Sequence, residues 1–328
     1  MKGTIIATGA YAPDRVVCND EISRFVDTDD EWITKRTGIK RRHIAEKETV
    51  SSMAAKAAKD ALKNAQISAD KIDLIIVSTM TPDCIMPCTA CIVQKEIGAE
   101  NAFCFDLNAA CTGFAAAIIT AQAYMEIKFA KYALVIGSEV LSGAVDWSDR
   151  SSCILFGDGA GAVLMRVSND LATLPVLSTE SEKSKDLTLY FRHGKSPLEE
   201  NEKNDWQDKK YYIGMKGRTI FEFALRKIPY ALEELLKKNN LKKEDIKFYI
   251  LHQANLRIIE AAAKRLNEPM EKFPFNVDEY GNTSSASIPI LLNELDKKGM
   301  LKDNDKIAIV GFGAGLSFGA DLITWNKN

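Results

Sequence analysis

The sequence predicts an α/β fold made of two similar halves, each with a mixed β-sheet that helices cover on both faces. Two observations lead to this prediction. A repeat runs through the chain at one fixed spacing, and helical patterns alternate with short apolar runs typical of strands. The composition agrees with a compact globular protein, since 46% of the 328 residues are hydrophobic and 27% are charged.

The repeat has an offset of 174 residues, as from residue 67 to residue 241. It relates two stretches that read as a polar turn feeding a strand, two buried-strand patterns that end in glycine, and two asparagines. The pairs are 67–77 with 241–251, 132–137 with 306–311, and Asn108 with Asn282. Because three landmarks share one spacing, we interpret the chain as two homologous halves.

Within the first half, helices and strands are expected to alternate. Residues 51–64 have helical spacing after a capping serine, and residues 72–77 form a short β-branched run. An alanine-rich apolar helix is expected over 109–124, and the next strand over 133–136. This alternation predicts α/β layers with mixed sheets.

We divide the chain into an N-terminal half, residues 1–178, and a C-terminal half, residues 211–328. The segment between them, 179–210, is rich in charge and lacks sustained periodicity, so we expect an exposed excursion or linker. A lid over the functional site is the alternative interpretation of this segment.

The charge and the cysteine count exclude some classes of protein. A formal net charge of −2, with 43 basic and 45 acidic side chains interspersed, favours neither nucleic acid nor an anionic membrane as a partner. No stretch approaches about 18 continuous apolar residues, and the first apolar run is too short for a signal peptide. We therefore expect a cytoplasmic protein whose 7 cysteines, an odd number, are reduced thiols.

Cys111 is the first candidate for chemistry. It follows the strand-like run 103–105 and opens the alanine-rich helix, so its sulfur is expected near a helix N-terminus. The helix dipole and free N–H groups there lower a thiol pKa from its ordinary value of about 8.5. The small neighbours Ala110 and Gly113 leave room for a substrate. We expect a thiolate nucleophile at Cys111, with a buried structural cysteine as the alternative.

His252 and Asn282 are the candidates in the second half. His252 ends the predicted strand 248–251, where α/β folds place their active sites. Asn282 holds in the second half the place that Asn108 holds beside Cys111 in the first. If the halves pack about a pseudo-two-fold axis, the equivalent helix starts converge and bring Cys111 and Asn282 together. A turn or cap asparagine is the alternative.

Two other patterns were weighed. The glycine-rich runs 156–162 and 311–319 form neither a phosphate loop nor a dinucleotide motif, so we expect tight turns that lend N–H groups to an oxyanion. Cys84, Cys88 and Cys91 have a spacing that invites a zinc site. No fourth ligand follows nearby, and we expect no metal.

Six motifs follow one another along nearly the whole chain. They are VDTDDEWITKRTGIKRRHI (26–44), NAACTGF around Cys111, DRSSCILFGDGAGAVL (149–164), HQANLRII (252–259), GNTSSAS around Asn282 and GFGAGLSFG (311–319). In these motifs the chain resembles the β-ketoacyl-acyl-carrier-protein synthase III family, the initiating condensing enzymes of the thiolase fold. The resemblance implies a duplicated, thiolase-like α/β fold with the layers α-β-α-β-α.

The resemblance also implies a set of site residues. The catalytic group falls on Cys111, His252 and Asn282, and the backbone N–H groups of Cys111 and Ala314 form the oxyanion hole. The remaining roles fall on three groups: coenzyme A binding on Thr28, Trp32, Arg36, Arg150 and Arg257; docking of the acyl carrier protein (ACP) on Arg257, Lys264 and Arg265; and the acyl pocket on Met86, Met215 and Gly217. An indole can stack an adenine, and guanidinium groups can fork onto phosphates.

Three positions depart from the family pattern. Glu222 stands where a relative can carry a basic residue, Ala314 where glycine is frequent, and Phe318 where tryptophan is common. Ala314 still has a backbone N–H to donate, whereas Glu222 interrupts the expected basic docking patch.

The reaction implied by the resemblance starts fatty-acid biosynthesis. An acyl-CoA, with acetyl-CoA as the expected primer, acylates Cys111. Malonyl-ACP then loses carbon dioxide to give an enolate, which accepts hydrogen bonds from neutral His252 and Asn282. The enolate attacks the acyl group and forms a 3-oxoacyl carrier protein. The resemblance implies no cofactor, because coenzyme A thioester and carrier protein are substrates. It also implies a homodimer in which Met86 closes the acyl pocket of the mate.

Three alternatives stay open at this point. The nearest is a related synthase that primes a polyketide or another specialised product. A cysteine hydrolase uses Cys, His and Asn in the same chain order, but its local signature is absent and the repeat has no place in it. A non-catalytic acyl-binding protein would have no need of all three polar residues in their motifs.

Overall fold

The first half forms a five-stranded sheet. In the computed structural model, which describes residues 2–169, 172–190 and 211–327, its strands are β1 (Lys2–Tyr11), β4 (Leu74–Ser78), β5 (Phe103–Leu107), β6 (Tyr132–Glu139) and β7 (Gly159–Ser168). Their order across the sheet is β1-β7-β6-β4-β5. β4 is parallel to β5 and β6, whereas β7 is antiparallel to β6 and β1.

The second half repeats this arrangement. Its sheet contains β8 (Val176–Thr179), β11 (Phe248–Leu251), β12 (Lys306–Gly313) and β13 (Ser317–Thr324), in the order β11-β12-β13-β8. β11 is parallel to β12, and the other two pairs are antiparallel. These relations match those of β4-β6-β7-β1, which confirms the prediction of two similar halves.

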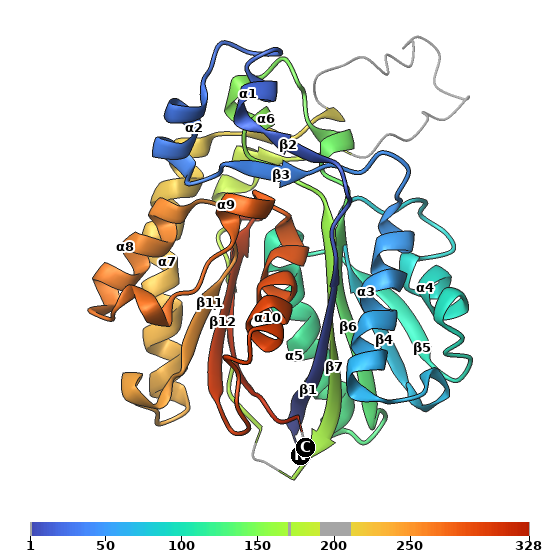
Figure 1. Cartoon of the computed structure of the whole chain (residues 1–328). Helices are drawn as coiled ribbons and strands as arrows, with labels where there is room; N and C mark the ends of the chain where they lie inside the picture. Colours follow the sequence, from blue (N-terminus) through green and yellow to red (C-terminus); the bar gives the residue numbers. More distant parts are fainter. Residues whose placement is uncertain (1, 170–171, 191–210, 328) are drawn as a thin grey trace.

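The helices form three layers around the two sheets (Figure 1). One pair covers the outer face of the first sheet, a second pair lies between the sheets, and a third covers the outer face of the second sheet. In that order the pairs are α3 (Val50–Ala65) with α4 (Thr89–Ile97), α5 (Gly113–Glu126) with α10 (Ser287–Lys297), and α7 (Gly217–Lys238) with α8 (Leu256–Leu266). The predicted α-β-α-β-α order is confirmed.

The sequence of each helix reflects its layer. α3 has one apolar face and begins at a capping box between Thr49 and Ser52, as an outer helix does. α5 is apolar nearly all round, because it is enclosed between the two sheets. β4 is buried at every residue, as a central parallel strand covered on both faces must be. In the described part of the chain, no helix combines the length and the apolar character needed to span a membrane.

Shorter elements surround this framework. The short strands and helices are β2 (Val16–Cys18), β3 (Arg41–His43), β9 (Leu187–Thr188), β10 (Gly214–Met215), α1 (Asn19–Ile22), α2 (Asp30–Thr37), α6 (Arg150–Cys153) and α9 (Val277–Tyr280). The 3₁₀ helices are η1 (Ala69–Lys71), η2 (Ala110–Thr112), η3 (Ser142–Ala144), η4 (Ser181–Asp186), η6 (Lys243–Asp245), η7 (Met270–Lys272) and η8 (Ser284–Ala286).

The segment 179–210, which the sequence predicts to be an exposed excursion, begins inside the second sheet. Thr179 belongs to β8, so the division after residue 178 runs through this strand. η4 follows, and β9 then pairs with β10. Residues 191–210 lie outside the described residues, and the choice between linker and lid for them stays a prediction.

The glycine-rich runs are mostly strands, which corrects the expectation of tight turns. Gly161 lies in β7, and Gly311 and Gly313 lie in β12; a turn is found only at 314–316, between β12 and β13. The reason is close packing. A Cβ atom at Gly161 would lie 2.6 Å from the backbone nitrogen of Ile290, so glycine lets α10 approach the sheet.

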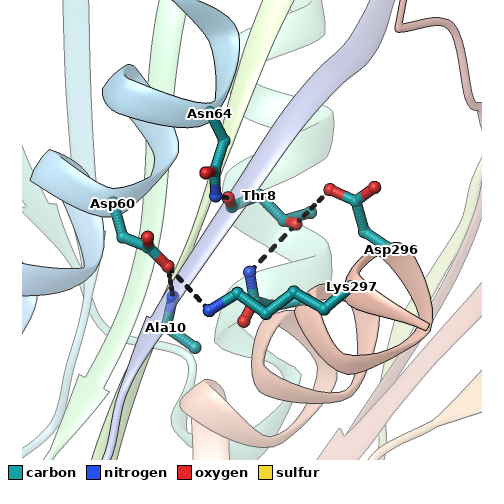
Figure 2. A network of polar contacts seen from close by, with 7 residues as sticks. Thr8, Ala10, Asp60, Asn64, Asp296 and Lys297 are labelled. Atoms are coloured by element: carbon teal, nitrogen blue, oxygen red, sulfur yellow. Dashed lines mark hydrogen bonds and ion pairs between the residues drawn. The ribbon is translucent and has the colours of Figure 1, made fainter. Parts of the chain in front are cut away.

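A polar network at the edge strand β1 connects an outer helix to a middle one (Figure 2). The Thr8 hydroxyl donates to Asp296 Oδ2 at 3.0 Å, and the Thr8 carbonyl accepts from Asn64 Nδ2 at 2.9 Å. Lys297 Nζ lies 3.1 Å from Asp60 Oδ2. Because α3 comes from the first half and α10 from the second, these contacts fasten the halves together.

We predict that Gly161→Ala lowers the free energy of unfolding by about 1–3 kcal/mol, because the added methyl group must displace the backbone of α10. Equilibrium denaturation in urea measures the change. Gly143→Ala is the control: no atom lies within 4 Å of the Cβ position at Gly143, and we expect a change within about 0.5 kcal/mol there. Equal effects of the two substitutions would contradict the close packing of α10.

Candidate active site

Cys111 lies in η2, between the end of β5 and the start of α5. This is the predicted place near a helix N-terminus. Only 6% of the residue is exposed, and its Sγ accepts a hydrogen bond from Ser284 Oγ at 3.3 Å. Because Ser284 belongs to the second half, the candidate nucleophile sits where the two halves meet.

The enclosure of Cys111 reverses the expected direction of its pKa. Burial raises the pKa of the thiol to about 12, and a negative charge on Glu139 would act in the same direction. The hydrogen bond from Ser284 lowers the pKa but does not outweigh the loss of solvation. The expectation of a lowered thiol pKa is therefore wrong, and Cys111 is a neutral thiol at pH 7.

His252 follows β11 directly, at the carboxyl end of that strand. It is buried, and burial alone lowers the pKa of the imidazole to about 3. Its Nδ1 lies 2.8 Å from Ser287 Oγ, and its ring meets Phe312 edge-on at 5.1 Å between centroids. The histidine is thus neutral at pH 7 and held in one orientation.

Asn282 has a counterpart in the first half, as the repeat predicts. Its Oδ1 accepts from the N–H of Ser284 at 2.9 Å, and Asn108 Oδ1 accepts from the N–H of Ala110 at 3.2 Å. Ser284 and Ala110 both have left-handed backbones, with φ of 50° and 47°. Asn282 therefore does act as a turn cap, and this contact leaves its amide nitrogen as the group that can donate to a substrate.

One cavity of about 530 Å³ brings the candidates together. Cys111, His252 and Asn282 all line it, although they come from η2, the end of β11 and the turn before η8. Gly313 and Ala314 line it as well, and a Cβ atom at Gly313 would lie 2.9 Å from Cys111 Cβ. The backbone after β12 thus lies against the thiol, next to the expected oxyanion donor Ala314.

The residues expected to bind coenzyme A lie in two places. Arg36 and Arg257 line the cavity. Two guanidinium groups lie close to the ring of Trp32, with Arg36 at 4.6 Å and Arg150 at 4.8 Å from the ring centroid. The Thr28 hydroxyl is buried without a hydrogen-bond partner among the described residues. The indole, the arginines and this unpaired hydroxyl form a surface suited to an aromatic base and phosphates.

The residues expected to dock the carrier protein share one helix. Arg257, Lys264 and Arg265 are exposed on α8. Glu222, the departure from the basic pattern, is exposed too and pairs with Arg218 at 2.8 Å. Because Arg218 lines the cavity, Glu222 also lies beside the cavity, and its negative charge is neutralised by this ion pair.

The residues expected to form the acyl pocket do not all lie at the cavity. Met215 and Gly217 line the cavity, whereas Met86 is 86% exposed and is not among its lining residues.

Cys88 and Cys91 lie in contact, with 3.3 Å between their sulfur atoms. Among the described residues, no group of three or more His, Cys, Asp or Glu side chains is placed to hold a metal ion.

Sequence reasoning missed three residues that contact the site. Ser284 donates to Cys111, Ser287 contacts His252, and Glu139 lies at the end of β6, where its carboxyl group contacts Ser285 beside Ser284. The GNTSSAS motif holds both serines, so the motif indicated their neighbourhood but not their contacts. Glu139 had no local signal, because it ends an otherwise apolar strand.

Two family models match the chain. The model described as 3-oxoacyl-[acyl-carrier-protein (ACP)] synthase III matches residues 105–182, and the model of its C-terminal part matches residues 236–325. The first range holds Cys111, and the second holds His252 and Asn282.

Solved structures have the same fold. The 3-oxoacyl-[acyl-carrier-protein] synthase III from Aquifex aeolicus VF5 has a TM-score of 0.90 and 44% identity, over 98% of this chain and 100% of that one. The priming β-ketosynthase from the R1128 polyketide biosynthetic pathway has a TM-score of 0.91 and 32% identity, over 99% of this chain and 96% of that one.

Curated relatives extend over nearly the same length. The β-ketoacyl-[acyl-carrier-protein] synthase III of Clostridium novyi (strain NT) is 47% identical over 322 residues, which are 97% of this chain and 98% of the relative. That of Clostridium perfringens (strain SM101 / Type A) is 48% identical over 319 residues, again 97% and 98%. By this identity over almost its whole length, the chain belongs to the β-ketoacyl-[acyl-carrier-protein] synthase III family.

Proposed function

We propose that this chain condenses an acyl-CoA primer with malonyl-ACP and releases coenzyme A and carbon dioxide. Acetyl-CoA is the expected primer. The product is a 3-oxoacyl carrier protein that starts fatty-acid biosynthesis. The observation that carries the proposal is the convergence of Cys111, His252 and Asn282, from three separate elements, on one cavity in a member of this family.

The first half-reaction is acyl transfer to Cys111. The sulfur attacks the thioester carbonyl, and the N–H groups of Cys111 and Ala314 hold the oxyanion that forms. The thioester then breaks, and the proton of the Cys111 thiol ends on the sulfur of coenzyme A. Because burial keeps this thiol neutral at rest, the thiolate exists only while substrate is bound.

The second half-reaction is decarboxylative condensation. The malonyl carboxylate leaves as carbon dioxide, and its electron pair forms an enolate on the carrier-protein thioester. His252 and Asn282 donate hydrogen bonds to the enolate oxygen, the enolate carbon attacks the acyl-Cys111 carbonyl, and the Cys111 thiolate leaves. No base is needed, which suits a neutral histidine and an asparagine.

The donor role of His252 requires a proton on Nε2. The hydroxyl of Ser287 has two acceptors in reach, His252 Nδ1 at 2.8 Å and the Ser284 carbonyl at 2.9 Å. When Ser287 donates to Nδ1, Nε2 carries the hydrogen of the neutral ring. During condensation, the Ser287 hydroxyl therefore donates its hydrogen bond to His252 Nδ1 rather than to the Ser284 carbonyl.

Substrate binding uses the basic surfaces next to the cavity. The adenine of coenzyme A stacks on Trp32. Its phosphates are contacted by Arg36, Arg150 and Arg257, and the unpaired hydroxyl of Thr28 donates a hydrogen bond to coenzyme A. Lys264 and Arg265 continue this charge along α8 toward an acidic carrier protein. The cytoplasmic location and the absence of a cofactor stay expectations from the sequence.

A homodimer is proposed from the edge of the first sheet. β5 is the last strand of that sheet, and Phe103 on it is 51% exposed within an aromatic cluster with Phe105, Tyr124 and Phe129. An exposed apolar edge strand favours pairing with a second copy. The exposed Met86 is then free to close the acyl pocket of the mate.

A priming role in polyketide synthesis is the second candidate. The likeness to the R1128 priming β-ketosynthase favours it, because that structure matches this fold as well as the fatty-acid enzymes do. The two roles differ in the primer that reacts and in the carrier protein that serves, so the accepted acyl chains separate them.

We predict that wild-type protein forms one acyl adduct with acetyl-CoA, and that Cys111→Ser forms none, because the thiol is the nucleophile. A panel of straight and branched acyl-CoAs, followed by intact mass measurement and peptide mapping, checks this. Cys153→Ser, at another buried cysteine, is the control and keeps the adduct. A folded wild type that no acyl-CoA modifies at Cys111 would refute the proposed function.

We predict that Asn282→Ala slows condensation by ~10²–10³-fold and changes acyl transfer by less than ~10-fold, because the amide donor serves only the enolate. Single-turnover measurements separate the two half-reactions. Asn282→Asp keeps the oxygen that caps Ser284 and loses the donor, so its condensation falls as well. Equal losses in both half-reactions would count against this division of roles.

We predict that Phe103→Asp converts a dimer into a monomer, since a buried unpaired carboxylate opposes association. Analytical ultracentrifugation measures the mass in solution. The control is Phe275→Asp, at an exposed phenylalanine outside the aromatic cluster, which keeps the dimer. A wild type that sediments as a monomer would exclude the proposed assembly.

A further inference from the structure

Glu139 is a buried acid that the proposed mechanism does not use. It is the last residue of β6 and is fully buried. The repeat offset of 174 residues makes Glu139 the counterpart of Gly313, and Ser285 the counterpart of Cys111. The thiol of the first half rests against a glycine of the second, and the serine of the second half contacts a carboxyl group of the first.

The contacts of Glu139 divide between its two oxygens. Oε2 accepts hydrogen bonds from Thr79 Oγ1 at 3.1 Å, Thr81 Oγ1 at 2.7 Å and the N–H of Met80 at 3.1 Å. Oε1 has a different neighbour, Ser285 Oγ at 3.0 Å. One oxygen therefore behaves as a carbonyl acceptor, while the other faces a single hydroxyl.

Counting protons around Ser285 assigns a proton to Glu139. The Ser285 hydroxyl lies 2.8 Å from the carbonyl of Ser78, which can only accept. A hydroxyl has one proton, and the shorter of its two contacts takes it. The 3.0 Å contact between Ser285 Oγ and Glu139 Oε1 then needs a proton from the carboxyl group, which must be a neutral acid.

The surroundings of Glu139 agree with a neutral acid. Within the described residues it forms no ion pair, and burial raises the pKa of its carboxyl group. The groups that face it are hydroxyls and an N–H from 79–81, Ser285 from η8, and Cys111 from η2. His252, on the other wall of the site, is uncharged. No cation among these groups compensates an ionised Glu139.

The contacts of Glu139 reach two walls of the site. Through Ser285 it holds η8, whose first residue, Ser284, donates to Cys111. Through Thr79 and Thr81 it holds the segment that carries Met80, a residue that lines the cavity. A charge at this place would oppose thiolate formation at Cys111, whereas a neutral acid keeps the contacts without that repulsion.

We propose that Glu139 is a neutral positioning residue, protonated on Oε1, that ties η8 and the segment 79–81 to Cys111 without opposing its thiolate. The pair Glu139–Ser285 is the repeat counterpart of the pair Gly313–Cys111. The functional part of this inference rests on the proposed role of Cys111, but the protonation state of Glu139 does not.

Infrared difference spectra at pH 7 test the protonation state directly. Wild type minus Glu139→Gln is expected to show a carboxylic-acid C=O band. Asp73→Asn is the matched control: the Asp73 carboxylate accepts from the N–H groups of Lys131 and Tyr132, and its loss removes a carboxylate band. A carboxylate band in the Glu139→Gln difference spectrum would overturn the proposal, whatever the enzyme's activity.

The thiol reports on the same question. Iodoacetamide alkylation of Cys111 from about pH 6 to about pH 10, followed by peptide mapping, reports a change in its pKa. This range lies below the thiol pKa of about 12, so the alkylation rate follows the thiolate fraction and rises about tenfold for each unit by which the pKa falls. Glu139→Gln is expected to leave this pKa unchanged, because it replaces one neutral group by another. A fall of about 1 unit or more in Glu139→Gln would show that the wild-type acid is ionised, and would overturn the proposal.

Acyl transfer tests the positioning role. We expect Glu139→Gln to transfer acyl groups within ~3-fold of wild type, and Glu139→Ala to be slower by ~10-fold or more, because η8 and 79–81 lose their common anchor. Ser285→Ala replaces Glu139→Ala if the latter does not fold, with the same expected loss. Transfer by the folded alanine variant at the rate of Glu139→Gln would overturn the positioning role.

Discussion

The whole site depends on one close approach, made twice. Each half presses the start of its middle helix against the central strand of the other half, at a glycine. A Cβ atom at Gly137 would lie 2.3 Å from the Ser285 carbonyl oxygen, and one at Gly311 would lie 2.8 Å from Thr112 Cα. These glycines are equivalent in the repeat. Any side chain there would push the helix starts apart and separate Cys111 from Ser284.

This approach encloses the reacting groups, and the enclosure decides their charges. The thiol of Cys111 and the imidazole of His252 are both neutral at pH 7, because burial costs a charged group its hydration. The proposed reaction suits such a site, because negative charge develops on substrate oxygens and the proposed donors to those oxygens are N–H groups without a charge. Neutral groups can line this wall without repelling that charge.

The duplication has diverged where chemistry demands it. The two turns keep the same asparagine cap and the same left-handed first residue, at Ala110 and Ser284. They differ at the next residue, which is Cys111 in one and Ser285 in the other. The first rests on Gly313 and stays open to the cavity, whereas the second is fastened by Glu139. In the proposed function, the turn with Cys111 is the reactive one, and the turn with Ser285 supports it.

The sequence predicted the two halves, the alternation of strands and helices, and the positions of Cys111, His252 and Asn282, because repeats, periodicity and motifs can be read along the chain. It misjudged the glycines of β7 and β12 as turns, since the atoms that exclude a side chain there come from a distant helix. It also misjudged the thiol pKa. A helix N-terminus can be read from nearby residues, but only the tertiary structure decided how completely the other half removes water from Cys111, and that loss of hydration outweighs the local effect.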